Sequence, residues 1–364
     1  MEVMSCSVPY IVAGPCSAES AEQMRAVSMA LARMPEVSMV RCGVWKPRTR
    51  PGGFEGHGEL ALQWIAALRA EVEAERHAQG LQSVGFCCEV ARPEHVELAV
   101  RYGMEAVWLG ARTTANPFMV QEVAEALRGT DMTVMVKNAP NPDVRLWMGA
   151  LERCRQAGVK SLMAVHRGFD VFRNEGYRNS PLWEVPIELR RLMPDVPQLC
   201  DPSHIAGRPE PIGALSQTAL DLGFEGLMIE VHPCPREALT DGGQQLTPDE
   251  LVGLLAGLVV RSTDSVVADE ELRLLREQID QIDMEVLQML AERFKVSERI
   301  AQVKREANLA VFQPKRWDAV LNGCIEKGME LGLGADFVKG VFERIHAESV
   351  RLQERTLGTD KGLD

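Results

Sequence analysis

The sequence predicts a (β/α)8 barrel followed by a separate all-helical module. Short apolar runs alternate with amphipathic stretches eight times over residues 1–260, and small polar residues follow at 261–269. Only helical patterns occur after that stretch. Eight regular units at this length are typical of a TIM barrel, in which parallel strands close inside a ring of helices. An open doubly wound sheet is the alternative, although it does not usually contain eight regular units.

Each expected strand is a short apolar run that ends in turn-forming or polar residues. The first run stops at Gly14-Pro15, because proline cannot continue a central strand and glycine permits a sharp turn. Strands are expected at residues 10–13, 39–43, 82–88, 106–109, 133–136, 161–165, 198–200 and 226–229. The amphipathic stretches predict helices at residues 21–33, 59–79, 93–102, 117–127, 144–157, 186–193, 212–222 and 248–260.

The C-terminal module begins with one long helical pattern. Apolar residues at three-and-four spacing, from Leu272 to Phe294, predict a helix over residues 270–308. A helix of about 39 residues cannot bury its apolar stripe within one small monomer. We therefore expect this domain, residues 270–364, to form a homodimer.

Two further helices complete the module. Pro314 suits the first turn of the second helix, and Gly332 and Gly334 end it. The third helix is expected over residues 336–356. The chain is therefore expected to divide into a barrel at 1–260, a linker at 261–269 and a three-helix domain at 270–364.

Composition and charge exclude several classes of protein. The 364-residue chain has a net charge of −12, and phosphate contacts need an excess of Lys and Arg, so nucleic acid is not an expected partner. Nine cysteines without a paired CxxC motif do not indicate a disulfide framework, and we expect a reducing, cytoplasmic location. The sequence shows no run of about 18 apolar residues and no signal peptide, so no membrane association is expected.

Polar side chains follow the expected strands, and in a β/α barrel the carboxyl ends of the strands form the working face. Four of these side chains could bind a metal ion: Cys16, His204, Glu230 and Asp241. Sulfur, nitrogen and carboxylate donors together suit a divalent transition metal such as Mn, Fe, Co or Zn. A lone cysteine is usually only packed, and a lone histidine is usually only hydrogen-bonded. The convergence of all four on one face favours a metal site.

Six cations are expected on the same face of this acidic protein: Arg41, Lys46, Arg48, Arg112, Lys137 and Arg167. A single surface cation usually has no function, but six together indicate anionic ligands. Arginine binds phosphate and carboxylate through two parallel hydrogen bonds. The substrates should therefore carry several phosphates or carboxylates. A nucleotide is not expected, because the sequence has no P-loop and no GxGxxG after a strand.

Six short motifs stand at these strand ends: Gly14-Pro15-Cys16-Ser17, Lys46-Pro47-Arg48-Thr49, Gly110-Ala111-Arg112, Lys137-Asn138, Asp201-Pro202-Ser203-His204 and Glu230-Val231-His232-Pro233. Together they resemble the 3-deoxy-D-arabino-heptulosonate 7-phosphate (DAHP) synthases, and most closely the compact type Iβ branch. The resemblance covers essentially the whole barrel. It implies an enzyme that condenses phosphoenolpyruvate with erythrose 4-phosphate at the entry to the shikimate pathway.

The resemblance also implies roles for single residues. The metal ligands would be Cys16, His204, Glu230 and Asp241, with Mn²⁺ as the first expectation and Fe²⁺, Co²⁺ or Zn²⁺ as alternatives. The anchors of phosphoenolpyruvate would be Arg41, Lys46, Arg112, Lys137 and Arg167, with Lys46 also acting in catalysis. The contacts of the sugar phosphate would be Arg48 and Thr49. Glu89 would lie near the reacting centre.

A related group of enzymes makes an eight-carbon keto acid phosphate and shares the Gly-Pro-Cys strand end. Those enzymes resemble Lys-Ala-Asn-Arg where this chain has Lys46-Pro47-Arg48-Thr49. The seven-carbon product is therefore expected here. A 3-deoxy-D-manno-octulosonate (KDO) 8-phosphate synthase is the alternative for the barrel.

The helical module carries polar residues at regular places: Leu275-Arg276, Leu290-Ala291-Glu292-Arg293, Lys304, Gln313, Arg316, Ser349 and Gln353. These positions are similar to the site of the all-helical chorismate mutases, which implies rearrangement of chorismate to prephenate. Eleven residues separate Arg293 from Lys304, about three helical turns, so they share a face. Arg276 lies 17 residues before Arg293 and points elsewhere, so it would reach a site in a partner subunit. Ser349 and Gln353 form an i, i+4 pair.

The module departs from that family at two positions. Gln313 stands where the family usually has Asp, and Trp317 stands where it has a Glu that contacts the substrate hydroxyl. We expect this departure to affect the efficiency of the mutase, but not its contacts with the carboxylates and the ether oxygen of the substrate.

The two domains also predict a link between their activities. Because both belong to one pathway, we expect prephenate or chorismate bound in the helical dimer to inhibit the synthase. One alternative is a helical module that binds a ligand without turnover. Another is a dimerisation coiled coil, against which the internal Arg, Lys and Gln residues argue.

Overall fold

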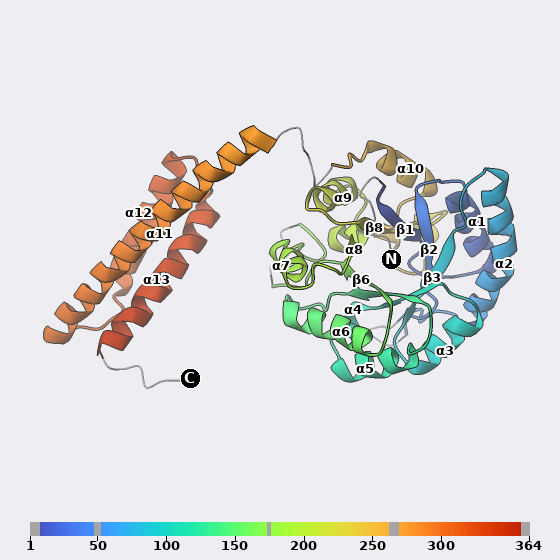
Figure 1. Ribbon diagram of the computed structural model, residues 1–364, viewed down its shortest axis with the longest axis horizontal. Coiled ribbons are helices and arrows are strands. Elements are labelled where there is room, and N and C mark those ends of the chain that lie inside the picture. Colours follow the sequence, from blue (N-terminus) through green and yellow to red (C-terminus); the bar gives the residue numbers. More distant parts are fainter. Residues whose placement is uncertain (1–7, 47–51, 173–175, 262–268, 358–364) are drawn as a thin grey trace. The chain divides into compact units, whose positions relative to one another are not determined.

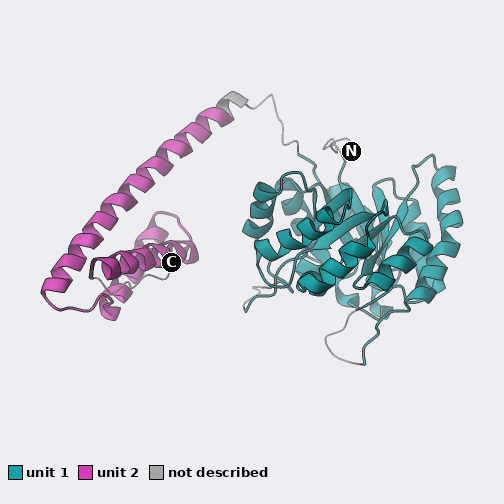
Figure 2. Cartoon of the chain, turned by 60° about the horizontal axis from the view of Figure 1, so that its bottom comes forward, with its two compact units in different colours: residues 1–264 teal, residues 265–364 magenta. Residues whose placement is uncertain are grey.

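The computed structural model describes residues 8–46, 52–172, 176–261 and 269–357. The expected sugar-phosphate contacts Arg48 and Thr49 and the linker residues 262–268 lie outside these ranges. The chain forms two compact units, residues 1–264 and 265–364, which Figure 2 colours separately.

Eight parallel strands close into a barrel in chain order, which confirms the predicted fold (Figure 1). The strands are β1 (Tyr10–Gly14), β2 (Val37–Cys42), β3 (Gly85–Val90), β4 (Ala106–Leu109), β5 (Thr133–Lys137), β6 (Ser161–His166), β7 (Gln198–Cys200) and β8 (Gly226–Glu230). The ring closes where β1 pairs with β8, in a register that sets Gly14 opposite Glu230. This closure brings the loop after β1 beside the end of β8.

Eight longer helices surround the barrel: α1 (Ala21–Ala32), α2 (Glu59–Ala78), α3 (Pro93–Arg101), α5 (Pro117–Ala126), α6 (Val144–Gln156), α7 (Glu184–Leu192), α9 (Ile212–Asp221) and α10 (Pro248–Gly257). Side-chain caps fix several of their starts. Asn116 accepts hydrogen bonds from the first turn of α5, Asp143 does so for α6, and Thr247 forms a capping box with Glu250 on α10.

Four short helices were not predicted: α4 (Ala111–Thr114), α8 (Pro202–Ala206) and the 3₁₀ turns η1 (Pro235–Glu237) and η2 (Gly242–Gln244). They follow β4, β7 and β8, at the carboxyl ends of the strands. Each is too short to show a helical apolar period in the sequence. Their position matters because they carry or adjoin several predicted site residues.

The barrel has two apolar cores. The larger one lies between the strands and the helices, and the smaller one fills the barrel with Val12, Met39, Cys87, Ala106, Trp108, Met135, Met163, Val165, Leu199 and Met228. The buried ring of Trp108 lies 5.0 Å from the guanidinium carbon of Arg41 and 5.8 Å from Lys137 Nζ. The indole of Trp108 thus lies at the end of the inner core and contacts two buried cations.

The C-terminal unit contains three helices: α11 (Asp269–Glu306), α12 (Pro314–Glu330) and α13 (Ala335–Leu357). Helix α13 packs against both of the others. Helix α11 leaves a row of large apolar side chains exposed, among them Leu275, Ile279, Ile282, Val286, Leu287, Met289, Val296 and Val303. An exposed apolar row of this length is typical of a surface that a partner covers.

No helix in the described part of the chain is both long enough and apolar enough to span a membrane.

Close packing at the barrel closure predicts a sharp difference between two glycines. A β-carbon at Gly226 in β8 would lie 2.1 Å from the carbonyl oxygen of Tyr10, whereas one at Gly213 in α9 would meet nothing within 4 Å. We expect Gly226→Ala to lower the free energy of unfolding of the barrel by about 1–3 kcal/mol or more. Gly213→Ala should be neutral or should stabilise by about 0.5–1 kcal/mol. Thermal unfolding of the barrel followed by circular dichroism tests this pair, and equal midpoints would contradict the described closure.

Candidate functional site

A cavity of about 440 Å³ opens at the carboxyl ends of the barrel strands. Seven predicted site residues line it: Lys46, Glu89, Arg112, Lys137, Arg167, His204 and Asp241. They come from β3, β5 and the loops after β2, β4, β6, β7 and β8. Because the strands are parallel, residues that lie far apart in the sequence come together at one end of the barrel.

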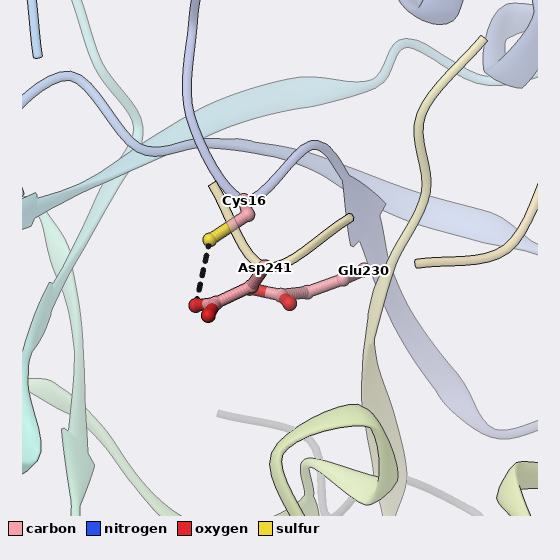
Figure 3. Close-up of side chains that lie close together, drawn as sticks. All are labelled: Cys16, Glu230 and Asp241. Atoms are coloured by element: carbon pink, nitrogen blue, oxygen red, sulfur yellow. Dashed lines mark hydrogen bonds between the residues drawn. The ribbon is translucent and has the colours of Figure 1, made fainter. Parts of the chain in front are cut away.

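Three of the four predicted metal ligands form a cluster beside this cavity (Figure 3). One donor atom each of Cys16, Glu230 and Asp241 lies within 4.8 Å of the others. The thiol of Cys16 donates to Asp241 Oδ2 at 3.4 Å, the dashed contact in Figure 3. Cys16 and Glu230 lie close together because β1 and β8 pair. Asp241 belongs to the loop between η1 and η2.

The fourth predicted ligand, His204, faces this cluster without belonging to the three-residue group. Its Nε2 lies 3.8 Å from Glu230 Oε1, and its Nδ1 lies 2.8 Å from Asp201 Oδ2. Asp201 also caps α8 by accepting from the His204 backbone N–H at 3.1 Å. The carboxylate thus orients the imidazole, a common arrangement for a histidine whose other nitrogen binds a metal.

Hydrogen bonds tie the loops of two candidate ligands together. The backbone N–H of Cys16 donates to Gln245 Oε1 at 2.9 Å, and Gln245 Nε2 donates to the carbonyl of Thr240 at 2.9 Å. Asp241 follows Thr240 and has a left-handed φ of 48°, an unusual conformation for a residue other than glycine. Thiol, carboxylate and imidazole donors held in this way fit a divalent transition metal.

Burial and the neighbouring charges shift the pKa values of Cys16 and Asp241 in opposite directions. Burial, reinforced by Glu230, raises the pKa of Cys16 to about 12, although Lys46 Nζ at 3.1 Å from the sulfur opposes this shift. Burial alone would raise the pKa of Asp241, but Arg178, His204 and Lys46 lower it to about 2. These pKa values correspond to a protonated thiol beside an ionised carboxylate near pH 7, and metal binding would release the thiol proton.

A buried ion-pair network borders the cavity, and its Lys137 lines the cavity. Asp201 contacts Lys137 Nζ at 2.6 Å, and Arg41 Nη2 donates to Glu230 Oε1 at 3.0 Å. Burial alone would raise the pKa of Asp201, but His204, Lys137 and Arg41 lower it well below its ordinary value. Arg41, expected to anchor a substrate, is only 1% exposed and does not line the cavity. In the structure its guanidinium contacts the Glu230 carboxylate instead.

Five cations line the cavity, and four of them were among the predicted site residues; the fifth, Arg178, was missed, as was the neutral Asn179 beside it. Arg167 Nη1 donates to Asn179 Oδ1 at 2.8 Å, and burial lowers the pKa of Arg167 to about 10. Arg178 contacts Asp241 Oδ1 at 3.0 Å and also donates to Gln244. Arg178 and Asn179 line the cavity from the long β6–α7 loop, where no strand end marks them in the sequence.

Glu89 is nearly buried within β3, and one glycine makes room for it. A β-carbon at Gly110 would lie 2.2 Å from Glu89 Oε1, so only glycine lets the carboxylate occupy this place. The Gly110-Ala111-Arg112 motif therefore has two separate effects. Its glycine accommodates the Glu89 carboxylate, and its arginine adds a cation to the cavity.

In the helical unit, four of the predicted polar residues meet between α11 and α13. Arg293 Nη1 donates to Ser349 Oγ at 2.6 Å, and Lys304 Nζ donates to Gln353 Oε1 at 3.2 Å. The side chains of Ser349 and Gln353 are buried. Three other predicted residues, Arg276, Gln313 and Arg316, are exposed. Trp317 stacks on His346 with ring centroids 3.9 Å apart.

Residues 7–264 match the model of the DAHP synthetase I family, about two thirds of the chain. The chain belongs to this family. Residues 275–354 match the model of chorismate mutase type II, so the helical unit is a domain of that kind.

Several proteins are similar to one part or the other. A phospho-2-dehydro-3-deoxyheptonate aldolase of Thermotoga maritima is 28% identical over 236 residues, which are 65% of this chain and 64% of that protein. A crystal structure of a DAHP synthase from the same organism superimposes with a TM-score of 0.57 at 25% identity, over 68% of this chain and 67% of that one. A 2-dehydro-3-deoxyphosphooctonate aldolase of Desulfotalea psychrophila is 24% identical over 68% of this chain and 88% of its own. The bifunctional chorismate mutase/prephenate dehydratase of Aquifex aeolicus is 35% identical over 81 residues, 22% of each protein.

The buried ion-pair network predicts that replacing the Asp201 carboxylate has a large effect on the stability of the barrel. We expect Asp201→Asn to destabilise the barrel by about 3–5 kcal/mol, because Lys137 loses its partner in a buried place. The pKa of Asp201 is held well below its ordinary value, so this difference from the unchanged protein should persist above about pH 4 and shrink only in stronger acid.

Asp195→Asn is the matched control, because Asp195 pairs with Arg155 at 2.8 Å on the exposed surface. It should cause no measurable loss. Urea unfolding of the barrel across a range of pH compares the two variants. Similar losses from both substitutions would contradict the network.

Proposed function

We propose that the barrel condenses phosphoenolpyruvate with erythrose 4-phosphate to give DAHP and phosphate. One observation carries this proposal: the cluster of Cys16, Glu230 and Asp241 borders a cavity that five cations line. The cations supply sites for the carboxylate and phosphates of two anionic reactants, and the mixed donors supply a place for a metal ion. The location proposed for the enzyme is the cytoplasm, where the eight free cysteines of the described ranges would stay reduced.

Phosphoenolpyruvate would lie against Lys46, Arg112, Lys137 and Arg167. Asn138 and Asn179 hold Arg167 through hydrogen bonds of 2.8 Å to its backbone N–H and its guanidinium. Such a held guanidinium can bind an oxyanion with little further loss of side-chain entropy. The four-carbon phosphate would lie toward Arg48 and Thr49, and Glu89 would lie near the reacting carbons.

In the proposed reaction, C3 of phosphoenolpyruvate forms a bond to the aldehyde carbon of the sugar phosphate. Water then adds at C2, and the phosphate group departs with the former enol oxygen, leaving the keto acid. Lys46 and Lys137 stabilise charge on the transferred groups, and Glu89 is placed to exchange protons with the added water. A divalent ion held by Cys16, His204, Glu230 and Asp241 would supply Lewis acidity toward the aldehyde oxygen. We propose Mn²⁺ first, with Fe²⁺, Co²⁺ and Zn²⁺ as alternatives.

Metal removal tests the ligand set. Dialysis against a chelator should abolish condensation, and adding back Mn²⁺ should restore it, as followed by loss of phosphoenolpyruvate absorbance. Cys16→Ala should bind metal at least about tenfold more weakly, which elemental analysis and competition with a chromophoric chelator would show. Cys154→Ala, a buried cysteine of the larger core, serves as the control that keeps its metal. Full activity of the metal-stripped protein would refute this assignment.

The aldehyde substrate separates the two candidate products. A comparison of erythrose 4-phosphate with arabinose 5-phosphate at equal concentration should favour the four-carbon sugar. A clear preference for arabinose 5-phosphate would replace the proposed activity with that of a KDO 8-phosphate synthase.

The helical unit is proposed to rearrange chorismate to prephenate as a homodimer. The reaction is unimolecular, so holding the reactive conformer is the main requirement. Arg293 would bind one carboxylate, and Lys304 with Gln353 would hydrogen-bond the ether oxygen as negative charge builds there. Arg276 would bind the other carboxylate from the partner subunit, because the exposed apolar row on α11 that surrounds it would lie in the dimer interface. Gln313, Arg316 and Ser349 would complete the site.

Two arginine variants test this shared site. Arg293→Ala and Arg276→Ala should each remove most mutase activity and leave condensation unchanged. Mixed dimers of the two variants should recover part of the activity, because one of their two sites would be intact. Arg299→Ala, a cation of α11 without a proposed role, is the control. No recovery in mixed dimers would contradict a site shared between subunits.

The fusion of the two domains supports feedback by the mutase product. We propose that prephenate, or chorismate, bound in the helical dimer lowers the rate of the barrel reaction. Condensation rates measured over a series of prephenate concentrations test this. If rates are unaltered at saturating occupancy of the mutase site, the feedback proposal fails. If prephenate inhibits while chorismate is not consumed, the helical unit is a regulatory binding module and not a mutase.

A further inference from the structure

A stacked pair of rings adjoins the polar residues between α11 and α13. The imidazole of His346 lies on the indole of Trp317, with ring centroids 3.9 Å apart and planes at 15°. On α13, Ser349 and Gln353 follow His346 by three and seven residues. These spacings put all three side chains on one face of the helix.

The imidazole has hydrogen-bonding capacity that the protein leaves unused. Within the described residues, Nε2 of His346 is enclosed and has no hydrogen-bond partner. The neighbouring polar groups are already joined, Arg293 to Ser349 and Lys304 to Gln353. An enclosed polar atom without a partner costs about 1–3 kcal/mol, so one that remains next to a ligand site is a candidate contact for the ligand.

The charge around this ring defines what it can bind. Burial lowers the pKa of His346, and the positive charges of Arg293 and Lys304 lower it further. The imidazole is therefore neutral near pH 7 and offers a neutral donor or acceptor beside two cations. Trp317 fixes the plane of the ring from one side, which limits the direction in which Nε2 can form a hydrogen bond.

We propose that Nε2 of His346 binds the ring hydroxyl of the substrate held by Arg293 and Lys304. This inference rests on the proposed mutase function. Chorismate carries two carboxylates, an ether oxygen and one hydroxyl. The arginines match the carboxylates, and Lys304 with Gln353 matches the ether oxygen. The hydroxyl remains, and it is the group that a neutral imidazole matches. His346 is thus a substrate-binding residue that sets specificity for a hydroxylated ring.

The experiment compares chorismate with an analogue that lacks only the ring hydroxyl. In the full-length chain, His346→Leu should lower kcat/KM for chorismate roughly tenfold or more and leave kcat/KM for the analogue within about twofold. His346→Gln, which keeps a polar group, should recover part of the loss. His95→Leu is the matched control, because His95 stacks on Trp45 at 3.9 Å in the barrel. It should leave mutase kinetics unchanged.

Several results would overturn the inference. If His346→Leu lowers kcat/KM equally for chorismate and for the analogue, the ring has a structural role and the contact is excluded. If it changes kcat/KM for neither substrate, the contact is also excluded. Calorimetric binding of both ligands repeats the comparison without turnover. Absent turnover in the unchanged protein would therefore refute the proposed mutase activity, whereas loss of the binding preference in His346→Leu would still support this contact. An equal effect of His346→Leu on both affinities would refute it.

Discussion

The structure of the larger unit depends on the neutralisation of two buried carboxylates. Asp201 and Glu230 are both fully buried, and an isolated charge in that environment would be strongly destabilising. Lys137 and Arg41 provide the compensating charges at 2.6 and 3.0 Å. This pairing determines which atoms face the cavity. Arg41 is held below by Glu230, and His204 is oriented by Asp201, so that its Nε2 faces the candidate metal ligands.

Closure of the barrel explains why so much of this site could be predicted from the sequence. Once strands alternate with helices eight times, the residues after each strand must meet at one end. Cys16, Lys46, Lys137 and Asp241 could be assigned to one site on that ground alone. The pairing of β1 with β8 turns this general expectation into a contact, because it sets Gly14 beside Glu230.

Other parts of the site could not be predicted from the sequence, for identifiable reasons. Arg178 and Asn179 lie deep in a long loop, and no periodicity indicates where such a loop folds back. Arg41 belongs to the cluster of cations in the sequence, but alternation along β2 does not show that its partner is a carboxylate beneath the cavity. The short helices α4 and α8 contain too few residues for a helical pattern. They were missed although they carry Arg112 and His204.

In the helical unit, the helices could be predicted from the sequence, but the contact between the two rings could not. Its three helices, the shared face of Arg293 and Lys304 and the i, i+4 pair of Ser349 and Gln353 follow from helical spacing together with a family resemblance. The hydrogen bonds that join these residues across α11 and α13, and the stack of Trp317 on His346, depend on packing between helices that spacing does not fix. The departure at Trp317 appeared in the sequence only as a missing carboxylate. In the structure Trp317 also stacks on His346, the residue proposed to bind the ring hydroxyl of the substrate.

X-ray absorption of the Co²⁺-loaded protein tests the central claim about the barrel most directly, because it identifies the atoms around the ion without relying on activity. The account predicts one ion per chain with a single sulfur neighbour and nitrogen and oxygen neighbours besides, and loss of the sulfur neighbour in Cys16→Ser. A spectrum with only nitrogen and oxygen neighbours in the unchanged protein would contradict it.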